Sequence, residues 1–327
     1  MKMPGIKVSN IRKVFDNGEH NAFTDLCRFH DRIYLTFRSC PDGHPIFSTS
    51  RIIVLSSENG ESWEEVFNFG VPLRDVRDPH FLVFRDRLFV YTGCWLVERD
   101  RGRDINQHLG FGSWTDDGKE WHGPAPLEGT HGHYVWRAAA YGGRAYLCGR
   151  RRHHFVPRTG GEENRELIEA ALLESENGLV WKFRTLFTDT FGDETSFLFE
   201  EDGSITAIVR GHGSCQARVC RSKPPYEDWS RVELDRNIGG PLLARWGNGY
   251  LVGGRKTIDP DKPRTTLYWL VDDRLWQAVE LPSDGDNSYP GFVDTGGGRA
   301  LLSYYSSHED PGKPGSSSIY LANLVLE

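Results

Sequence analysis

Short apolar runs separated by polar turns recur along the whole chain. The runs 23–29 and 33–37 flank the turn His30-Asp31-Arg32, and the runs 81–84 and 88–91 flank Arg85-Asp86-Arg87. Paired runs of β-forming residues around turn residues predict β-hairpins. The pattern returns around residues 141–144, 200–203, 246–249 and 296–298. It predicts six hairpins, each the start of a unit, with the units beginning near residues 22, 77, 134, 193, 239 and 288.

An octapeptide follows each of the first four hairpins. Its eight positions are two variable residues, an acidic residue, any residue, Gly, two further residues and Trp. Its copies are 56–63, 114–121 and 174–181, with a degenerate copy at 222–229 that lacks the Gly. An acidic residue, a polar residue and Gly are turn chemistry, so each copy predicts a second hairpin turn within its unit. We expect the acids Glu58, Asp116 and Glu176 to be structural, because these turns join outer strands.

Repetition at an interval of 58 to 60 residues (Trp63 to Trp121, Trp121 to Trp181) is typical of a closed array of supersecondary units. The last unit supplies only three strands, and residues 6–14 form a strand without a unit of its own. That strand would complete the last unit and close the ring, which leaves only short protected edges. We therefore predict an all-β chain, residues 1–327 forming a single six-bladed β-propeller domain, with five or seven blades as the alternative count.

Composition narrows the partners. The net charge of −7 provides no basic field for nucleic acid, and no run of eighteen apolar residues predicts a membrane span. Residues 1–10 lack the apolar region of a signal peptide, so we expect a cytoplasmic protein unless a leader was removed. The six Cys form no Cys-x-x-Cys pair and the His residues have no ligand spacing, so we expect reduced thiols, no metal and no cofactor. The oligomeric state stays open.

Propeller geometry predicts where a site would lie. The start of the first strand, the end of the second and the start of the third meet near the axis on one face of each blade. These positions carry arginines, carboxylates and tyrosines, which suit an anionic or hydroxyl-rich ligand such as a carbohydrate. They are Thr24, Asp25, Asp78, Arg137, Asp193, Glu194 and Tyr289 in first strands, Arg38, Trp95, Arg150, Arg210, Arg255, Tyr304 and Tyr305 in second strands, and Arg264 in a third strand.

The octapeptides resemble the Asp-box (BNR) repeats of the sialidase superfamily, and the likeness extends over nearly the whole chain. The inner-strand motifs resemble those of bacterial sialidase-like proteins; they are 21–26, 77–79, 193–196, 239–241 and 288–291. The resemblance implies an exo-acting glycoside hydrolase that removes an acidic or sialic-acid-like terminal sugar. Members of the superfamily use an arginine triad on the substrate carboxylate, a Tyr nucleophile with a Glu partner, and an Asp acid/base.

Carried onto this chain, the resemblance gives Tyr289 as the nucleophile, Glu194 as its partner and Arg210 as the second triad arginine. Arg264 resembles the third arginine, with Arg255 as its rival. Asp42 resembles the acid/base, with Asp25 and Asp78 as competitors. The remaining substrate-binding candidates are Arg38, Arg137 and Tyr304.

One position departs from the family pattern. Thr24 stands where the first triad arginine belongs, and Arg38 on the neighbouring strand is the candidate replacement. Two alternatives to hydrolysis therefore stay open: a glycan-binding propeller without catalysis, and a polysaccharide lyase in which Tyr or His serves as base.

Overall fold

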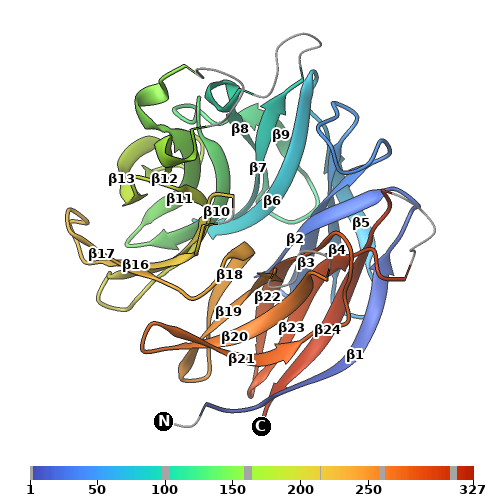
Figure 1. Ribbon diagram of the computed structural model, residues 1–327. Helices are drawn as coiled ribbons and strands as arrows, with labels where there is room; N and C mark the ends of the chain where they lie inside the picture. Colours follow the sequence, from blue (N-terminus) through green and yellow to red (C-terminus); the bar gives the residue numbers. More distant parts are fainter. Residues whose placement is uncertain (1–2, 98–103, 158–163, 214, 258–261, 310–314) are drawn as a thin grey trace.

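The computed structural model describes residues 3–97, 104–157, 164–213, 215–257, 262–309 and 315–327. Within these residues the strands form six four-stranded antiparallel sheets (Figure 1). The first three blades are β2 (His20–Phe29), β3 (Arg32–Cys40), β4 (Arg51–Ser57) and β5 (Glu64–Phe69); β6 (Arg74–Phe84), β7 (Arg87–Leu96), β8 (Leu109–Thr115) and β9 (His122–Pro126); and β10 (Tyr134–Tyr141), β11 (Arg144–Arg152), β12 (Ile168–Ser175) and β13 (Lys182–Thr188).

The other three blades complete a ring. They are β14 (Gly192–Phe199), β15 (Ile205–Gly211), β16 (Arg218–Ser222) and β17 (Trp229–Glu233); β18 (Ile238–Trp246), β19 (Gly249–Lys256), β20 (Arg264–Val271) and β21 (Arg274–Glu280); and β22 (Asn287–Gly296), β23 (Arg299–Ser306) and β24 (Ser318–Leu326) with β1 (Ile6–Phe15). The first strand of each blade contacts the first strand of the next, and β22 returns to β2. The six-bladed propeller is thus confirmed.

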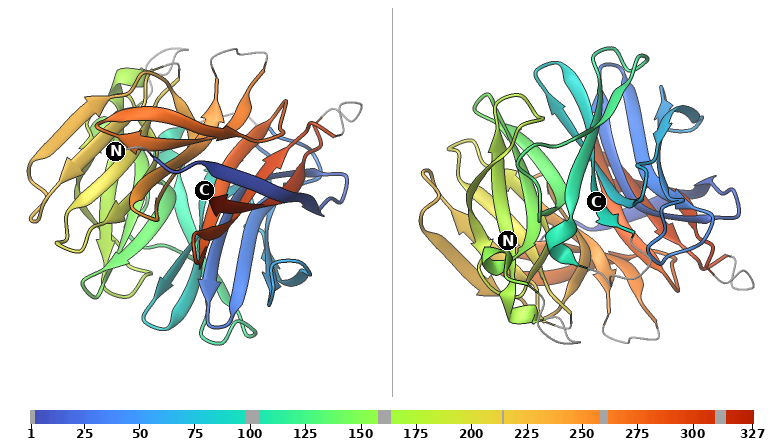
Figure 2. Two further views of the ribbon diagram at one scale, coloured as in Figure 1. Left: turned by 90° about the horizontal axis from the view of Figure 1, so that it is seen from below. Right: turned by 90° about the horizontal axis from the view of Figure 1, so that it is seen from above.

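The N-terminal strand closes the ring as predicted. β1 pairs antiparallel with β24, from Ile6 opposite Leu326 to Phe15 opposite Ile319. In Figure 2 the blue strand runs along the red C-terminal strands. The last blade is therefore built from both ends of the chain. The helices of the described residues are three short 3₁₀ turns, and none is long and apolar enough to cross a membrane.

Burial follows the position of a strand in its blade. Seven of the ten residues of β2 are buried in one run, whereas the outer strands β5, β9 and β17 are mostly exposed. Inner strands are covered on both faces by neighbouring blades, which explains why they read as continuous apolar runs instead of alternating. The hydrophobic cores therefore lie between the blades. Polar residues that are buried in the inner strands near the axis depart from this pattern and call for an explanation.

The repeated octapeptides form the predicted outer turns. In the first copy Ser57 Oγ accepts a hydrogen bond from Gly60 N, and Asn59 Oδ1 accepts from Glu61 N and Ser62 N. Thr115 with Asp117, and Ser175 with Asn177, make the same bonds in the next two copies. The acids Glu58, Asp116 and Glu176 lie outside and pair with Arg32, Arg87 and Arg144 of the adjacent hairpin turns. They are structural surface residues, as expected.

Every first strand carries a bulge at the same height. The register slips between Ala22 and Asp25 in β2, and at equivalent positions in the other five blades. A bulge turns side chains out of the regular alternation and is common beside active sites. The residues inside the six bulges are 23–24, 78–79, 136–137, 193–194, 240–241 and 289–290. This one irregularity therefore presents the predicted first-strand residues except Asp25.

Candidate active site

A tyrosine from the last blade meets a glutamate and an arginine from the fourth blade at the centre of this face. Tyr289 donates a hydrogen bond to Glu194 Oε1 at 2.6 Å, and Arg210 Nη1 lies 2.8 Å from Glu194 Oε2 and 3.2 Å from the Tyr289 hydroxyl. Glu194 and Tyr289 are buried. The sequence-based triple of Tyr289, Glu194 and Arg210 is thus brought into direct contact.

Backbone geometry fixes this contact. Tyr289 has φ of 51° and Gly240 has φ of 60°, both in the left-handed region. Gly240 donates its N–H to Glu194 Oε2 at 2.9 Å, and a Cβ at Gly240 would lie 2.5 Å from the ring of Tyr289. Only glycine allows this approach. Gly240 therefore positions both members of the pair.

Aromatic rings and a second arginine surround Tyr289. The rings of Phe23, Tyr305 and Trp136 lie 4.9, 6.0 and 6.1 Å from its ring, and the Arg255 guanidinium lies 5.5 Å above it. Burial first, and then the charge of Glu194, raises the pKa of Tyr289 well above its ordinary value. The hydroxyl is therefore protonated at rest, and Glu194 is the group placed to take its proton.

Asp78 is the second acid of the same pocket. Its Oδ2 accepts a hydrogen bond from Tyr134, and among the described residues its buried Oδ1 has no hydrogen-bond partner. Burial first, and then the charge of Glu194, raises the pKa of Asp78 to about 6. A carboxyl whose pKa is raised by a second carboxyl in the same pocket is suited to act as an acid.

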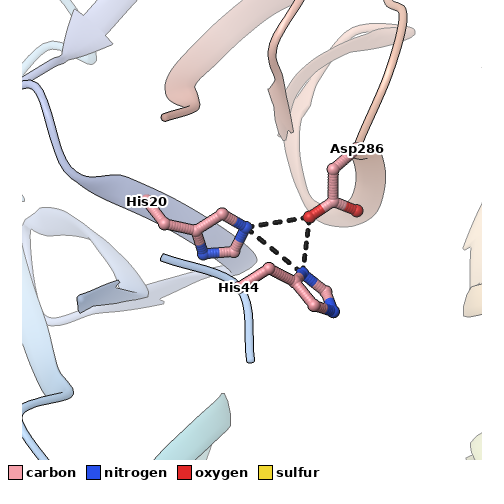
Figure 3. Close-up of side chains that lie close together, drawn as sticks. All are labelled: His20, His44 and Asp286. Carbon is pink, nitrogen blue, oxygen red and sulfur yellow. Dashed lines mark hydrogen bonds and ion pairs between the residues drawn. The ribbon is translucent and has the colours of Figure 1, made fainter. Parts of the chain in front are cut away.

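Asp286 organises the rim on the side of Arg255. Its Oδ1 accepts hydrogen bonds from Arg255 Nη2 and the Tyr305 hydroxyl, each at 2.8 Å. Its Oδ2 accepts from His20 Nε2 at 2.8 Å and His44 Nδ1 at 2.7 Å (Figure 3). Burial would raise the pKa of Asp286, but the bonds from the two imidazoles and the charge of Arg255 outweigh it and hold this pKa well below its ordinary value. The carboxylate thus anchors Arg255 above Tyr289.

His20, His44 and Asp286 have the ligand types of a transition-metal site, with the three facing atoms close together. The contact between Arg38 and His20 argues against metal binding by this cluster. Arg38 Nη1 lies 3.2 Å from His20 Nδ1, and an arginine nitrogen can only donate, so Nδ1 is an acceptor and the proton of the neutral ring sits on Nε2. That proton points to Asp286. We assign the cluster as a hydrogen-bonded network.

Arg137 and Asp25, both predicted site residues, form a separate buried pair. Arg137 Nη1 lies 3.0 Å from Asp25 Oδ1, while Nε and Nη2 donate to the carbonyls of Pro241 and Pro290. Asp25 Oδ2 also accepts from Phe81 N. Every nitrogen of Arg137 is engaged, and the bonds join four blades across the axis. The pair is a structural tie, and Asp25 is not free to serve as acid/base.

Arg38 and Asp42 also have structural partners. Arg38 is fully buried; it donates twice to Asp75 Oδ1 at 3.0 Å, and to the carbonyls of Gly43 and Pro45. It cannot reach a ligand in the place of the missing arginine. Asp42 is exposed and accepts a hydrogen bond from Thr49. Both residues shape the β3–β4 loop, which presents His44.

Arg264 and Arg255, the two candidates for the third triad arginine, differ in their contacts. Arg264 pairs with Asp284 at 2.8 Å on the surface, whereas Arg255 lies over Tyr289. The two neighbouring tyrosines differ in the same way. Tyr304 points into the core and donates to the carbonyl of Pro282, and Tyr305 points to Arg255 at 2.8 Å. Alternation along β23 separates them, and only the register shows which one faces the pocket.

Two residues of the pocket escaped the sequence argument. Arg77 lies 5.2 Å from the ring of Phe23, bonds the His44 carbonyl at 2.6 Å and pairs with Asp75 at 3.2 Å. Burial would lower its pKa, but the charge of Asp75 first, and then those of Tyr134, Asp78 and Tyr289, raise it. Its position next to Asp78 in the motif 77–79 could have identified it from the sequence. Asp286 was missed because it precedes the last inner strand and belongs to no motif.

Comparisons with known proteins agree on the fold. No protein-family model matches the chain, and no curated protein matches its sequence. A protein of unknown function from Dyadobacter fermentans superposes with a TM-score of 0.79 at 20% identity, covering 99% of this chain and all of the other. The Trypanosoma rangeli sialidase gives 0.68 at 12% identity, and Hadza microbial sialidase Hz136 gives 0.69 at 14%. This chain covers 98% and 93% of its own length in these two matches, but only 59% and 65% of theirs. The likeness establishes a sialidase-like propeller.

Proposed function

We propose that this protein is an exo-acting glycoside hydrolase of sialidase-like type, which removes an acidic or sialic-acid-like terminal sugar. The observation that carries the proposal is the Tyr289–Glu194 hydrogen bond of 2.6 Å with Arg210 against both groups. A structure of the similar Trypanosoma rangeli sialidase is described as a covalent intermediate with 2,3-difluorosialic acid. A nucleophile held against its base, and cations for a carboxylate, fit that chemistry.

The proposed reaction has two displacements. The Tyr289 oxygen attacks the anomeric carbon while its proton passes to Glu194, and Asp78 protonates the departing glycosidic oxygen. A water molecule, with Asp78 as its base, then attacks the anomeric carbon. The bond from this carbon to the Tyr289 oxygen breaks, and Glu194 returns the proton to that oxygen. Two inversions at one carbon give overall retention.

Three cations are assigned to the substrate carboxylate. Arg210 and Arg255 stand on one side of Tyr289, and Arg77 from the second blade stands near Phe23 on the other. Thr24 does not contribute, because its hydroxyl bonds the Tyr289 carbonyl at 2.8 Å and Ser303 at 2.7 Å. Arg77 thus takes the part that the family gives to an arginine at the position of Thr24.

Hydrolysis of aryl sialosides and aryl uronides tests the proposal. We expect Glu194→Gln to lower kcat by at least about 100-fold, because a positioned base is lost, and Tyr289→Phe to abolish the burst of aryl alcohol. Equal turnover by wild type and Tyr289→Phe would remove Tyr289 from the mechanism. Arg32→Ala, a change at an outer turn, serves as the control.

The departure at Thr24 favours a second candidate, a glycan-binding propeller without catalysis. It predicts retention of acidic glycans with no product after prolonged incubation. Release of free sugar by wild type, lost in Glu194→Gln, would decide against this candidate.

A further inference from the structure

A cavity of about 730 Å³ adjoins the pocket on the side of the fourth and fifth blades. Its lining includes Arg210 and Arg255, which contact Tyr289 and define its inner end, and Arg165, Arg236 and Asp235, which define its outer part. Four guanidinium groups and one carboxylate therefore face one cavity. The chain as a whole carries a net charge of −7, so this basic lining runs against its average.

The side chain of Arg165 packs against Gly213 at the cavity wall, where a larger residue would collide with it. Arg165 belongs to the 3₁₀ turn η3 (Arg165–Leu167), and its Nη1 lies 2.4 Å from where a Cβ of Gly213 would stand. Gly213 also has φ of +68°. Within the described part of the chain Arg165 makes no hydrogen bond or ion pair, and the residue is exposed. Its charge is therefore available to a ligand.

Arg236 is held rigidly at the same end. Its Nε donates to Asp235 Oδ1 at 2.7 Å, Nη2 bonds the other carboxylate oxygen, and the guanidinium lies 5.2 Å from the ring of Tyr268. Asn237 next to it bonds the carbonyls of Gly211 and Cys215 at 2.8 and 2.6 Å. The wall that carries Gly213 is thus fastened in place before a ligand arrives.

The inner arginines keep donors for an anion. Among the described residues Arg210 bonds Glu194 and Tyr289 through Nη1 and Arg255 bonds its partners through Nε and Nη2, which leaves Nη2 of Arg210 and Nη1 of Arg255 without a hydrogen bond. Gly239 lies between the two side chains, since its Cβ would be 3.3 Å from Arg255 Cβ and 3.8 Å from Arg210 Cζ. No side chain therefore separates Arg210 from Arg255 at this point, and the cavity that they line is also lined by Arg165 and Arg236.

We propose that the outer part of this cavity is a subsite for a second anionic group, carried by the sugar unit next to the terminal one. The inference rests on the proposed function, which places the terminal acid sugar at Arg210 and Arg255. The volume lies within the range of roughly 300–1,000 Å³ that suits ligands of this size. Guanidinium groups recognise carboxylate and sulfate oxygens in pairs, so the substrate class is an acidic oligosaccharide with anions on adjacent units.

Calorimetry with two matched pairs of probes tests the subsite. The first pair is α2,8-linked disialic acid and 3′-sialyllactose, and the second is a glucuronyl disaccharide with and without a sulfate ester on its second unit. Wild type is expected to bind the dianionic member of one pair about 10-fold more tightly. Arg165→Ala and Arg236→Ala should remove that preference, and Arg165→Lys should retain part of it. Arg32→Ala is the matched control.

The outcomes separate the two proposals. Arg210→Met should weaken both members of the preferred pair, since both place an anion at the inner end. Equal binding of the two members by wild type, or an unchanged preference in Arg165→Ala and Arg236→Ala, would overturn the subsite and leave the hydrolase proposal intact. Binding of none of the four probes would overturn the proposed function, and the subsite with it.

Discussion

Two arginine–carboxylate pairs lie near the axis of this propeller, and they differ in how completely they are satisfied. In the axial tie, Arg137 bonds Asp25 and the carbonyls of Pro241 and Pro290, so that each of its nitrogens is engaged. In the pocket, Arg210 bonds Glu194 and Tyr289 through Nη1 alone, while its Nε has no partner among the described residues. The same chemical pair thus serves cohesion in one place and recognition in the other.

The electrostatics follow the same division. Burial would raise the pKa of Asp25, yet the charge of Arg137 and the contact with His80 lower it, so the tie stays ionised. Asp78 in the pocket has a pKa raised to about 6 by burial and by Glu194. A group that titrates near neutral pH is useful for proton transfer and poor for holding blades together.

The largest effect is expected when the tie is broken. Arg137→Met leaves Asp25 as a buried charge with fewer partners, and we expect it to lower the free energy of unfolding by about 3–5 kcal/mol in urea titrations. Adding Asp25→Leu should restore part of the loss, because the uncompensated charge is removed as well. Arg210→Met should cost less, about 1–2 kcal/mol, since Glu194 keeps bonds from Tyr289 and Gly240. Equal losses for Arg137→Met and Arg210→Met would break the comparison.

Gly240→Ala tests the geometry of the pocket. Its Cβ would lie 2.5 Å from the Tyr289 ring, so we expect a loss of about 1–3 kcal/mol in unfolding free energy and a larger fall in kcat than in binding. Gly142→Ala is the matched control, because Gly142 also has positive φ, at +55°, and nothing lies within 4 Å of its Cβ. Similar losses in both variants would mean that backbone strain, and not the collision, is responsible.

Asp78 gives a dependence on pH. Its folded-state pKa of about 6 lies above the value of about 4 for an unfolded aspartate, so the folded protein holds the proton between these values. Its contribution of ~3 kcal/mol is present below pH 4 and is lost as the pH rises through about 6. Turnover should fall over the same range, as the acid form is consumed. Asp78→Asn should flatten both profiles, and an unchanged profile would assign the titration to another group.

The smallest effect is expected at Arg264. Its ion pair with Asp284 is half-exposed, so Arg264→Ala should change the unfolding free energy by less than about 1 kcal/mol and leave turnover unchanged. Arg255→Ala should raise KM for the acidic substrate, because Arg255 lies over Tyr289. A raised KM in Arg264→Ala would return that residue to the site.

Part of the site followed from sequence because its spacing follows from the fold. The blade repeat places the start of each first strand and the end of each second strand near the axis, which predicted that Tyr289, Glu194, Asp78 and Arg210 lie in one pocket. It could not separate Tyr304 from Tyr305, or Arg255 from Arg264, since positions one residue apart in the register differ only in which face of the sheet they occupy. The role of Gly240 was equally hidden, because its contact is with a residue from another blade.

The pattern of apolar runs and turns alone determined the hairpins, the outer turns, the six blades and the closing strand, because these depend on local propensity and on the need to leave no open edge. Tertiary structure alone decided which charged residue faces the pocket. The sequence offered Arg137 and Arg210, and Asp25 and Asp78, as candidates alike. The partners that other blades bring to them tell them apart. Those partners come from more than 50 residues away along the chain for Asp25 with Arg137 and for Glu194 with Tyr289, a separation over which local pattern carries no information.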